Sequence, residues 1–151
     1  LAHSSMWLVL IGGGADRAAV EAVAEELRMP DRVVSGAGRL SIGGLAALFT
    51  RSCLLITNDS GPLHLAEAVG LSTISFFGPE TPRFYGPWGS QHRVFYTGIP
   101  CSPCMSALNA KTVTCSIGFQ CLREIEVDEV VRAAEAMVAG AARTLHVETT
   151  V

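Results

Sequence analysis

The residues best suited to chemistry lie at positions 57–66, TNDSGPLHLA, where an apolar run gives way to a predicted helix. The first backbone N–H groups of a helix lack partners within it and carry a partial positive charge, so they can receive a phosphate group. Gly61 lets the backbone approach a ligand, Ser60 adds a hydroxyl, and His64 can donate to an anion or a sugar hydroxyl, while Asp59 suits hydroxyl donors. The competing interpretation is structural: Asp59 and Ser60 cap the helix, and His64 packs in an interface.

A second glycine-rich turn, Gly12-Gly13-Gly14-Ala15-Asp16, follows the first apolar run of the chain. It is similar to the dinucleotide-binding pattern G-x-G-x-x-G, but Arg17 stands where the third glycine belongs. No carboxylate follows the next predicted strand, near Val34, to hold a ribose. NAD binding is therefore disfavoured. Asp16 is interpreted either as the N-cap of the following helix or as a contact to a nucleotide.

Four of the five cysteines, Cys101, Cys104, Cys115 and Cys121, are spaced C-x2-C-x10-C-x5-C. A first pair two residues apart is typical of half a tetrahedral thiolate site, so the spacing predicts structural zinc. Reduced thiols, disulfides and an iron–sulfur cluster are the alternatives. Cys53 falls within a predicted strand and is interpreted as a small core residue.

The elements that must position these residues follow from the apolar pattern. Short apolar runs predict strands at 7–11, 33–34, 53–57, 73–77 and 93–97, and helical spacing with caps predicts helices at 16–28, 41–51, 62–70 and 127–139. This alternation predicts an α/β fold with an open, doubly wound (Rossmann-like) parallel sheet. We expect one domain over residues 1–140, incomplete at its N-terminus and including a cysteine-rich loop at 98–122, and then a tail at 141–151. Ligands of such sheets bind outside the carboxyl ends of the strands, where both turns lie.

Composition excludes several classes of protein. Of the 151 residues, 49% are hydrophobic and only 17% charged, which excludes a disordered chain. The net charge of −3 shows no excess of basic residues of the kind that binds nucleic acid. No apolar run reaches the ~20 residues of a membrane-spanning helix, and no signal peptide is recognisable. His3, His92 and His146 have no partner pattern and are interpreted as surface residues.

Residues 57–68, TNDSGPLHLAEA, together with Phe76-Phe77-Gly78-Pro79 and Gly86-Pro87, closely resemble the ADP-heptose:lipopolysaccharide heptosyltransferase family, glycosyltransferase family 9. The resemblance covers residues 7–139. It implies a GT-B architecture, in which two Rossmann-like domains enclose the active site in a cleft. The chain is similar to the C-terminal, donor-binding domain of that family. The family's first strand and a Thr/Lys loop that contacts phosphate precede the position of Trp7.

The resemblance also implies roles for individual residues. The Asp59–His64 loop matches the residues that hold the donor diphosphate and its sugar. Leu40 matches an apolar position beside the adenine, and Asp16 takes the place of an acidic residue near the ribose, where Glu is more familiar. The family's candidate base lies in the N-terminal domain, so no catalytic base is expected in this chain. Some members also have a P-C-x-P-C element, as at positions 100–104 here.

The function expected from this reasoning is donor binding in an inverting glycosyltransferase that moves heptose from ADP-heptose to a lipopolysaccharide core acceptor. No cofactor is needed for transfer. The expected partners are a nucleoside-diphosphate sugar, the missing N-terminal domain and a lipid-linked or oligosaccharide acceptor. The chain alone is expected to be inactive, and its expected location is the cytoplasm, with peripheral contact to the inner membrane as a further option. The alternatives are a non-catalytic nucleotide-sugar-binding module and half of a GT-B-like sugar epimerase.

Overall fold

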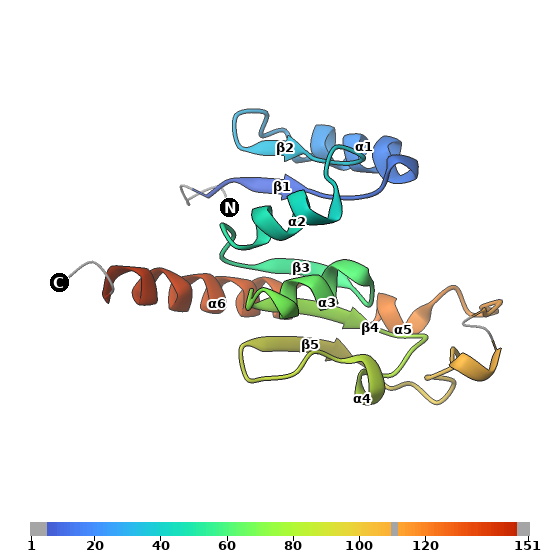
Figure 1. Ribbon diagram of the computed structural model, residues 1–151. Coiled ribbons are helices and arrows are strands. Elements are labelled where there is room, and N and C mark those ends of the chain that lie inside the picture. The colour runs from blue at the N-terminus through green and yellow to red at the C-terminus, as the bar shows by residue number, and fades with distance from the viewer. Residues whose placement is uncertain (1–5, 110–111, 148–151) are drawn as a thin grey trace. The chain divides into compact units, whose positions relative to one another are not determined.

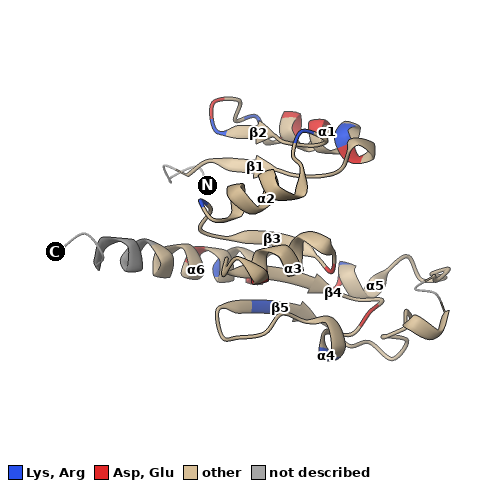
Figure 2. Ribbon diagram, viewed as in Figure 1, with Lys and Arg blue, Asp and Glu red and all other residues tan. Residues whose placement is uncertain are grey.

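The computed structural model describes residues 6–109 and 112–147, the last six of these by their backbone alone. The chain packs as two compact units, Leu1–Leu45 and Ala46–Val151. His3 and the side chain of His146 lie outside the described residues. Within them, no helix is both long enough and apolar enough to cross a bilayer. Figure 2 shows acidic and basic residues interspersed on the first helix, and no continuous basic stripe on the ribbon that it describes.

The first unit is a two-stranded parallel sheet with one helix against it (Figure 1). Strand β1 (Leu8–Leu10) pairs with β2 (Val33–Ser35), and between them run the 3-10 turn η1 (Gly14–Asp16) and helix α1 (Arg17–Leu27). α1 ends where Arg28 adopts a left-handed conformation, with φ 52°. All three residues of β1 are half-buried. Helix α2 (Ile42–Phe49) leads into the second unit, and the Ser41 hydroxyl accepts from the Gly44 N–H in its first turn, which is N-cap geometry.

The second unit is built on a three-stranded parallel sheet in the order β3-β4-β5 (Leu55–Asn58, Thr73–Phe77 and His92–Tyr96). β4 is central, and Ile74 and Phe77 are fully buried. Helix α3 (Gly61–Ala68) packs on β3 and β4 and buries Leu63 and Ala66, while α6 (Val127–Val147) packs against β4 (Figure 1). The shorter elements are α4 (Pro82–Tyr85), η2 (Ala107–Asn109) and α5 (Gln120–Arg123).

The parallel α/β class predicted from the sequence is confirmed, and several details differ. The strands form two separate ladders instead of one sheet. α4, η2 and α5 lie in segments predicted as loops, and α6 reaches Val147, so the predicted tail begins inside a helix. Cys53 is exposed, because β3 begins two residues later and Cys53 follows the turn after α2; its interpretation as a core residue is wrong. The interpretation of His92 as a surface residue is also wrong, because its ring bonds to Thr73 on the neighbouring strand.

Candidate functional site

The loop with the predicted phosphate-binding residues connects β3 to α3. β3 ends at Asn58, and the Asp59 N–H donates to the Phe76 carbonyl of β4 at 3.1 Å, so the loop leaves the sheet from a fixed point. Ser60 is extended, with φ −159° and ψ 168°, and α3 begins at the next residue. Pro62, in the first turn, has a φ that suits a helix start and has no N–H to leave unpaired. The chain therefore turns sharply at the carboxyl end of β3.

The Ser60 hydroxyl does not cap α3. It lies 3.2 Å from the Thr57 hydroxyl and donates to the Asn58 carbonyl at 3.2 Å. Ser60 therefore occupies the N-cap position of α3, but its side chain makes no capping hydrogen bond. The Leu63 N–H donates to the Ser60 carbonyl, while the Gly61 N–H has no acceptor among the described residues. A donor at the positive end of the helix dipole is thus available to an anion.

The space around Gly61, the residue that carries this N–H donor, is open. A Cβ built on Gly61 would meet no atom within 4 Å. Its φ does not fall in the left-handed region either, so neither packing nor backbone conformation within the described chain requires a glycine here. A ligand lying directly on the backbone would require one. The open space leaves room for a ligand beside the Gly61 backbone.

His64 stands in the first turn of α3 with 49% of its side chain exposed, so it does not pack in an interface of the described chain. Its Nδ1 lies 3.8 Å from Glu67 Oε2, three residues further along the helix. Glu67 Oε1 accepts a hydrogen bond from the Trp88 N–H at 2.7 Å. One carboxylate therefore ties α3 to the segment after α4 and places a negative charge beside the imidazole.

Sequence reasoning alone does not find Glu67 and Trp88 as members of this site. The spacing of Glu67 from His64 is a signal, because residues three apart on a helix lie side by side. No comparable signal joins Trp88 to Glu67, since 21 residues separate them and the contact depends on how the loop after β4 folds. Asp59 is half-buried at the start of the same loop. The structure thus places Asp59, Ser60, Gly61 and His64 on one loop and the helix turn that follows it.

Asp16 and Leu40 belong to the first unit. The Asp16 carboxylate accepts from the Gly13 N–H at 2.8 Å and makes no cap bond to α1, so it braces the glycine turn. The Gly38 N–H donates to the Gly12 carbonyl at 2.9 Å, which holds the loops after β1 and β2 side by side. Leu40 is 42% exposed at the end of the second loop. Both predicted nucleoside contacts therefore lie on neighbouring loops at the carboxyl ends of their strands.

The cysteines of the second unit are free thiols. Cys121, in α5, is buried, whereas Cys101 is exposed and Cys104 and Cys115 are half-buried. The Phe119 N–H donates to Cys115 Sγ at 3.1 Å. Burial raises the pKa of the Cys121 thiol; the Leu122 N–H opposes this rise, and the nearby Cys104, Cys101 and Cys115 add to it. Within the part of the chain that the structure describes, no three His, Cys, Asp or Glu side chains form a group that could hold a metal ion, so zinc stays a prediction.

Comparison with known proteins gives the family. Residues 2–113 match the model of glycosyltransferase family 9 (heptosyltransferase), which is more than half of the chain. The chain belongs to glycosyltransferase family 9. Among solved structures, a family 9 glycosyl transferase from Veillonella parvula superposes with a TM-score of 0.71 at 30% identity, covering 89% of this chain. The ADP-heptose LPS heptosyltransferase II of E. coli shares the fold, with a TM-score of 0.70 at 22% identity over 89% of this chain.

Curated relatives of this family 9 chain are heptosyltransferases by name. Lipopolysaccharide heptosyltransferase 1 of Pseudomonas aeruginosa is 36% identical over 67 residues, or 44% of this chain. Lipopolysaccharide heptosyltransferase 3 of Escherichia coli is 32% identical over 99 residues, or 64% of this chain. The matches span 19% and 29% of these two relatives and 37% of both solved structures, so the chain corresponds to a part of each.

Proposed function

We propose that this family 9 chain is the donor-binding domain of an inverting glycosyltransferase that takes heptose from ADP-heptose to a lipopolysaccharide core acceptor. The names of the relatives support a heptosyl group and a lipopolysaccharide acceptor. The observation that carries the proposal is Gly61: a free backbone donor at the start of α3 with open space above it, at the carboxyl end of β3.

Each residue of the loop has a role that its chemistry allows. The donor diphosphate lies over the Gly61 N–H, where the helix dipole favours negative charge. His64 donates to a diphosphate oxygen, and its exposed ring is free to reach a ligand. Asp59 accepts hydrogen bonds from sugar hydroxyls. Asp16 and Leu40, on the first unit, stay predicted nucleoside contacts.

In the proposed reaction, negative charge develops on the leaving diphosphate, where this loop can stabilise it. The acceptor oxygen attacks the anomeric carbon from the face opposite the diphosphate, and the bond from that carbon to the diphosphate oxygen breaks. The electron pair leaves with the diphosphate, and the acceptor proton passes to a base supplied by the N-terminal domain. Positive groups aimed at a developing negative charge are often the largest single contribution to catalysis, so the loop assists departure without a metal.

Gly61→Val tests the proposal, with Gly43→Val as the matched control. Both glycines are helical and have open space around a built Cβ, so both variants should keep the wild-type melting temperature within a few degrees. Calorimetric titration with ADP-heptose should show at least a tenfold loss of affinity for Gly61→Val and wild-type affinity for Gly43→Val. Equal affinity in all three proteins would refute the donor site.

A further inference from the structure

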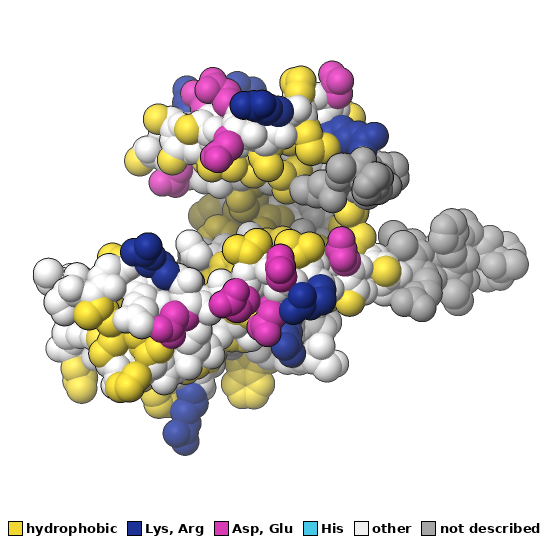
Figure 3. All heavy atoms as spheres, turned by 180° about the vertical axis from the view of Figure 1, so that it is seen from behind, with side chains coloured by type: hydrophobic (Ala, Val, Ile, Leu, Met, Phe, Trp, Pro, Cys, Tyr) yellow, Lys and Arg dark blue, Asp and Glu magenta, His cyan; other side chains and the backbone are white. Residues whose placement is uncertain are grey.

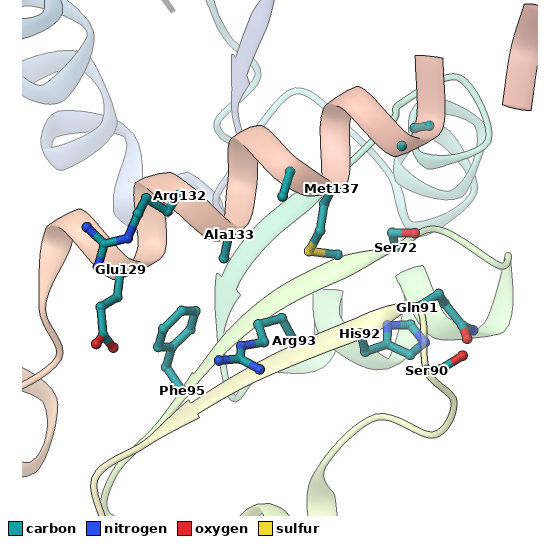
Figure 4. Close-up of a pocket in the computed structure, with 13 residues that line it drawn as sticks. Ser72, Ser90, Gln91, His92, Arg93, Phe95, Glu129, Arg132, Ala133 and Met137 are labelled. Carbon is teal, nitrogen blue, oxygen red and sulfur yellow. The ribbon is translucent and has the colours of Figure 1, made fainter. Parts of the chain in front are cut away.

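A second candidate site lies away from the Asp59–His64 loop, within the second unit. A groove of about 820 Å³ runs between α6 and β5, the outer strand of the ladder (Figure 4). It extends past Ser72, which precedes β4, and along His92, Arg93 and Phe95 of β5. These positions lie at the amino ends and middle of the strands, whereas the Asp59–His64 loop leaves the carboxyl end of β3. A cavity of this size suits a small organic molecule.

Two arginines enter the groove from facing elements. Arg93 projects from β5 and Arg132 from α6 (Figure 4). The Arg93 guanidinium lies over the Phe95 ring, 5.5 Å from its centroid, within the range of a cation–π interaction. Neither guanidinium has a carboxylate within salt-bridge distance among the described residues, although Glu129 lies one turn before Arg132 in the same wall. Figure 3 shows acidic and basic side chains interspersed among hydrophobic ones on the face of the molecule seen from behind.

The opposite end of the groove is polar without being charged. His92 Nδ1 lies 2.9 Å from the Thr73 hydroxyl, and His92 Nε2 is buried with no partner among the described residues. Ser72, Ser90 and Gln91 lie around it (Figure 4). A buried imidazole nitrogen without a partner costs free energy. Hydroxyl and amide side chains at this end can both donate and accept hydrogen bonds.

We propose that this groove binds a phosphorylated sugar. The phosphate group lies between Arg93 and Arg132, because guanidinium groups make paired, charge-assisted hydrogen bonds with phosphate oxygens. The sugar hydroxyls meet the polar end, at Ser72, Ser90 and Gln91. The apolar side chain of Met137 faces the ring carbons, and Phe95 lies at the arginine end, on the far side of Arg93 from His92 (Figure 4). This site is independent of the proposed donor site.

Titration with glucose 6-phosphate tests the site, with glucose and inorganic phosphate as separate probes. We expect glucose 6-phosphate to bind below about 10 mM, and each half alone to bind at least tenfold more weakly. Binding should also shift the NMR signals of the His92 ring. The double variant R93A/R132A should weaken glucose 6-phosphate binding at least tenfold. Both arginines are exposed, so the variant should keep its fold, which circular dichroism can verify.

Two controls keep this experiment specific. Arg83→Ala removes an exposed arginine of α4 outside the groove, and His64→Ala alters the donor loop; both should bind glucose 6-phosphate like the wild type. The proposal is overturned if glucose 6-phosphate does not bind, if R93A/R132A binds it equally well, or if inorganic phosphate binds as tightly as the sugar phosphate. Retained groove binding in His64→Ala, together with lost ADP-heptose binding, would separate the two sites.

Discussion

The contact between His64 and Glu67 predicts that these residues act together in donor binding. Glu67→Gln removes the negative charge 3.8 Å from His64 Nδ1 and keeps an amide oxygen that can accept from the Trp88 N–H. The substitution therefore separates the charge beside the imidazole from the tie between α3 and the segment after α4. His64→Ala removes the ring itself. The four proteins of a double-mutant cycle measure the coupling between the two side chains in binding ADP-heptose.

The expected size of that coupling follows from exposure. Two unit charges at this separation in water interact by about 1 kcal/mol, and measured pairs on protein surfaces give about 0.2–1 kcal/mol. Since half of the His64 side chain is exposed, we expect Glu67→Gln to lower donor affinity by about 1.4- to 5-fold. His64→Ala should cost about 1–3 kcal/mol, because a hydrogen bond to a charged group is lost.

Calorimetry on the wild type, both single variants and the double variant provides the assay. The double variant should bind no more weakly than His64→Ala, since Glu67 acts on the donor through the imidazole. Glu124→Gln, an exposed acidic position of the same unit, is the control and should bind like the wild type. Additive losses in the double variant would refute the role of Glu67 as a positioning residue. Unchanged affinity in His64→Ala would refute the role of His64.

Three further predictions concern the cysteines and the reaction. Protein kept reduced should carry about one equivalent of zinc if the four clustered cysteines bind it, and a chelator should then lower its Tm; elemental analysis that finds no metal would leave the free-thiol interpretation. Iodoacetamide should modify Cys53 before Cys121, because Cys53 is exposed, whereas Cys121 is buried and burial raises the pKa of its thiol. If mass spectrometry found the reverse order, the packing of α5 would be contradicted. The chain alone should transfer no sugar from ADP-heptose to a heptose-deficient acceptor. Positioning the acceptor can account for roughly 7–11 kcal/mol of barrier lowering, and it requires the N-terminal domain that forms the other side of the cleft. Turnover by the chain alone would contradict this prediction.

The sequence predicts best where one physical signal dominates. β4 is predicted with its exact bounds, because an apolar run between loops is what a strand buried on both faces requires. Local backbone structure decided the cases that failed. Cys53 continues an apolar run in the sequence, but it follows the turn after α2, and β3 begins only at Leu55. α4 and α5 are single-turn helices, too short for helical periodicity to appear in the sequence.

The sequence predicts which residue types form the candidate site, but it does not predict which residues contact one another there. Ser, Gly and Pro at a strand-to-helix turn predict a phosphate-binding loop from backbone chemistry alone. The tie from Glu67 to Trp88, and the arginines that share a groove from β5 and α6, join residues far apart in the sequence. His92 shows the same limit, because a lone histidine gives no sign of the Thr73 hydroxyl placed beside it by the register of β4 and β5.

Two glycines of the second unit show how fold and function can be separated at single positions. At Gly78, a built Cβ would lie 2.8 Å from Cys121 Sγ and 2.9 Å from Leu122, so packing of α5 against the end of β4 requires a glycine there. At Gly61, a built Cβ would meet nothing within 4 Å. A larger side chain at Gly78 must therefore destabilise the fold before it can affect any ligand. A larger side chain at Gly61 can be accommodated by the protein, so a loss of donor binding there would report the ligand itself.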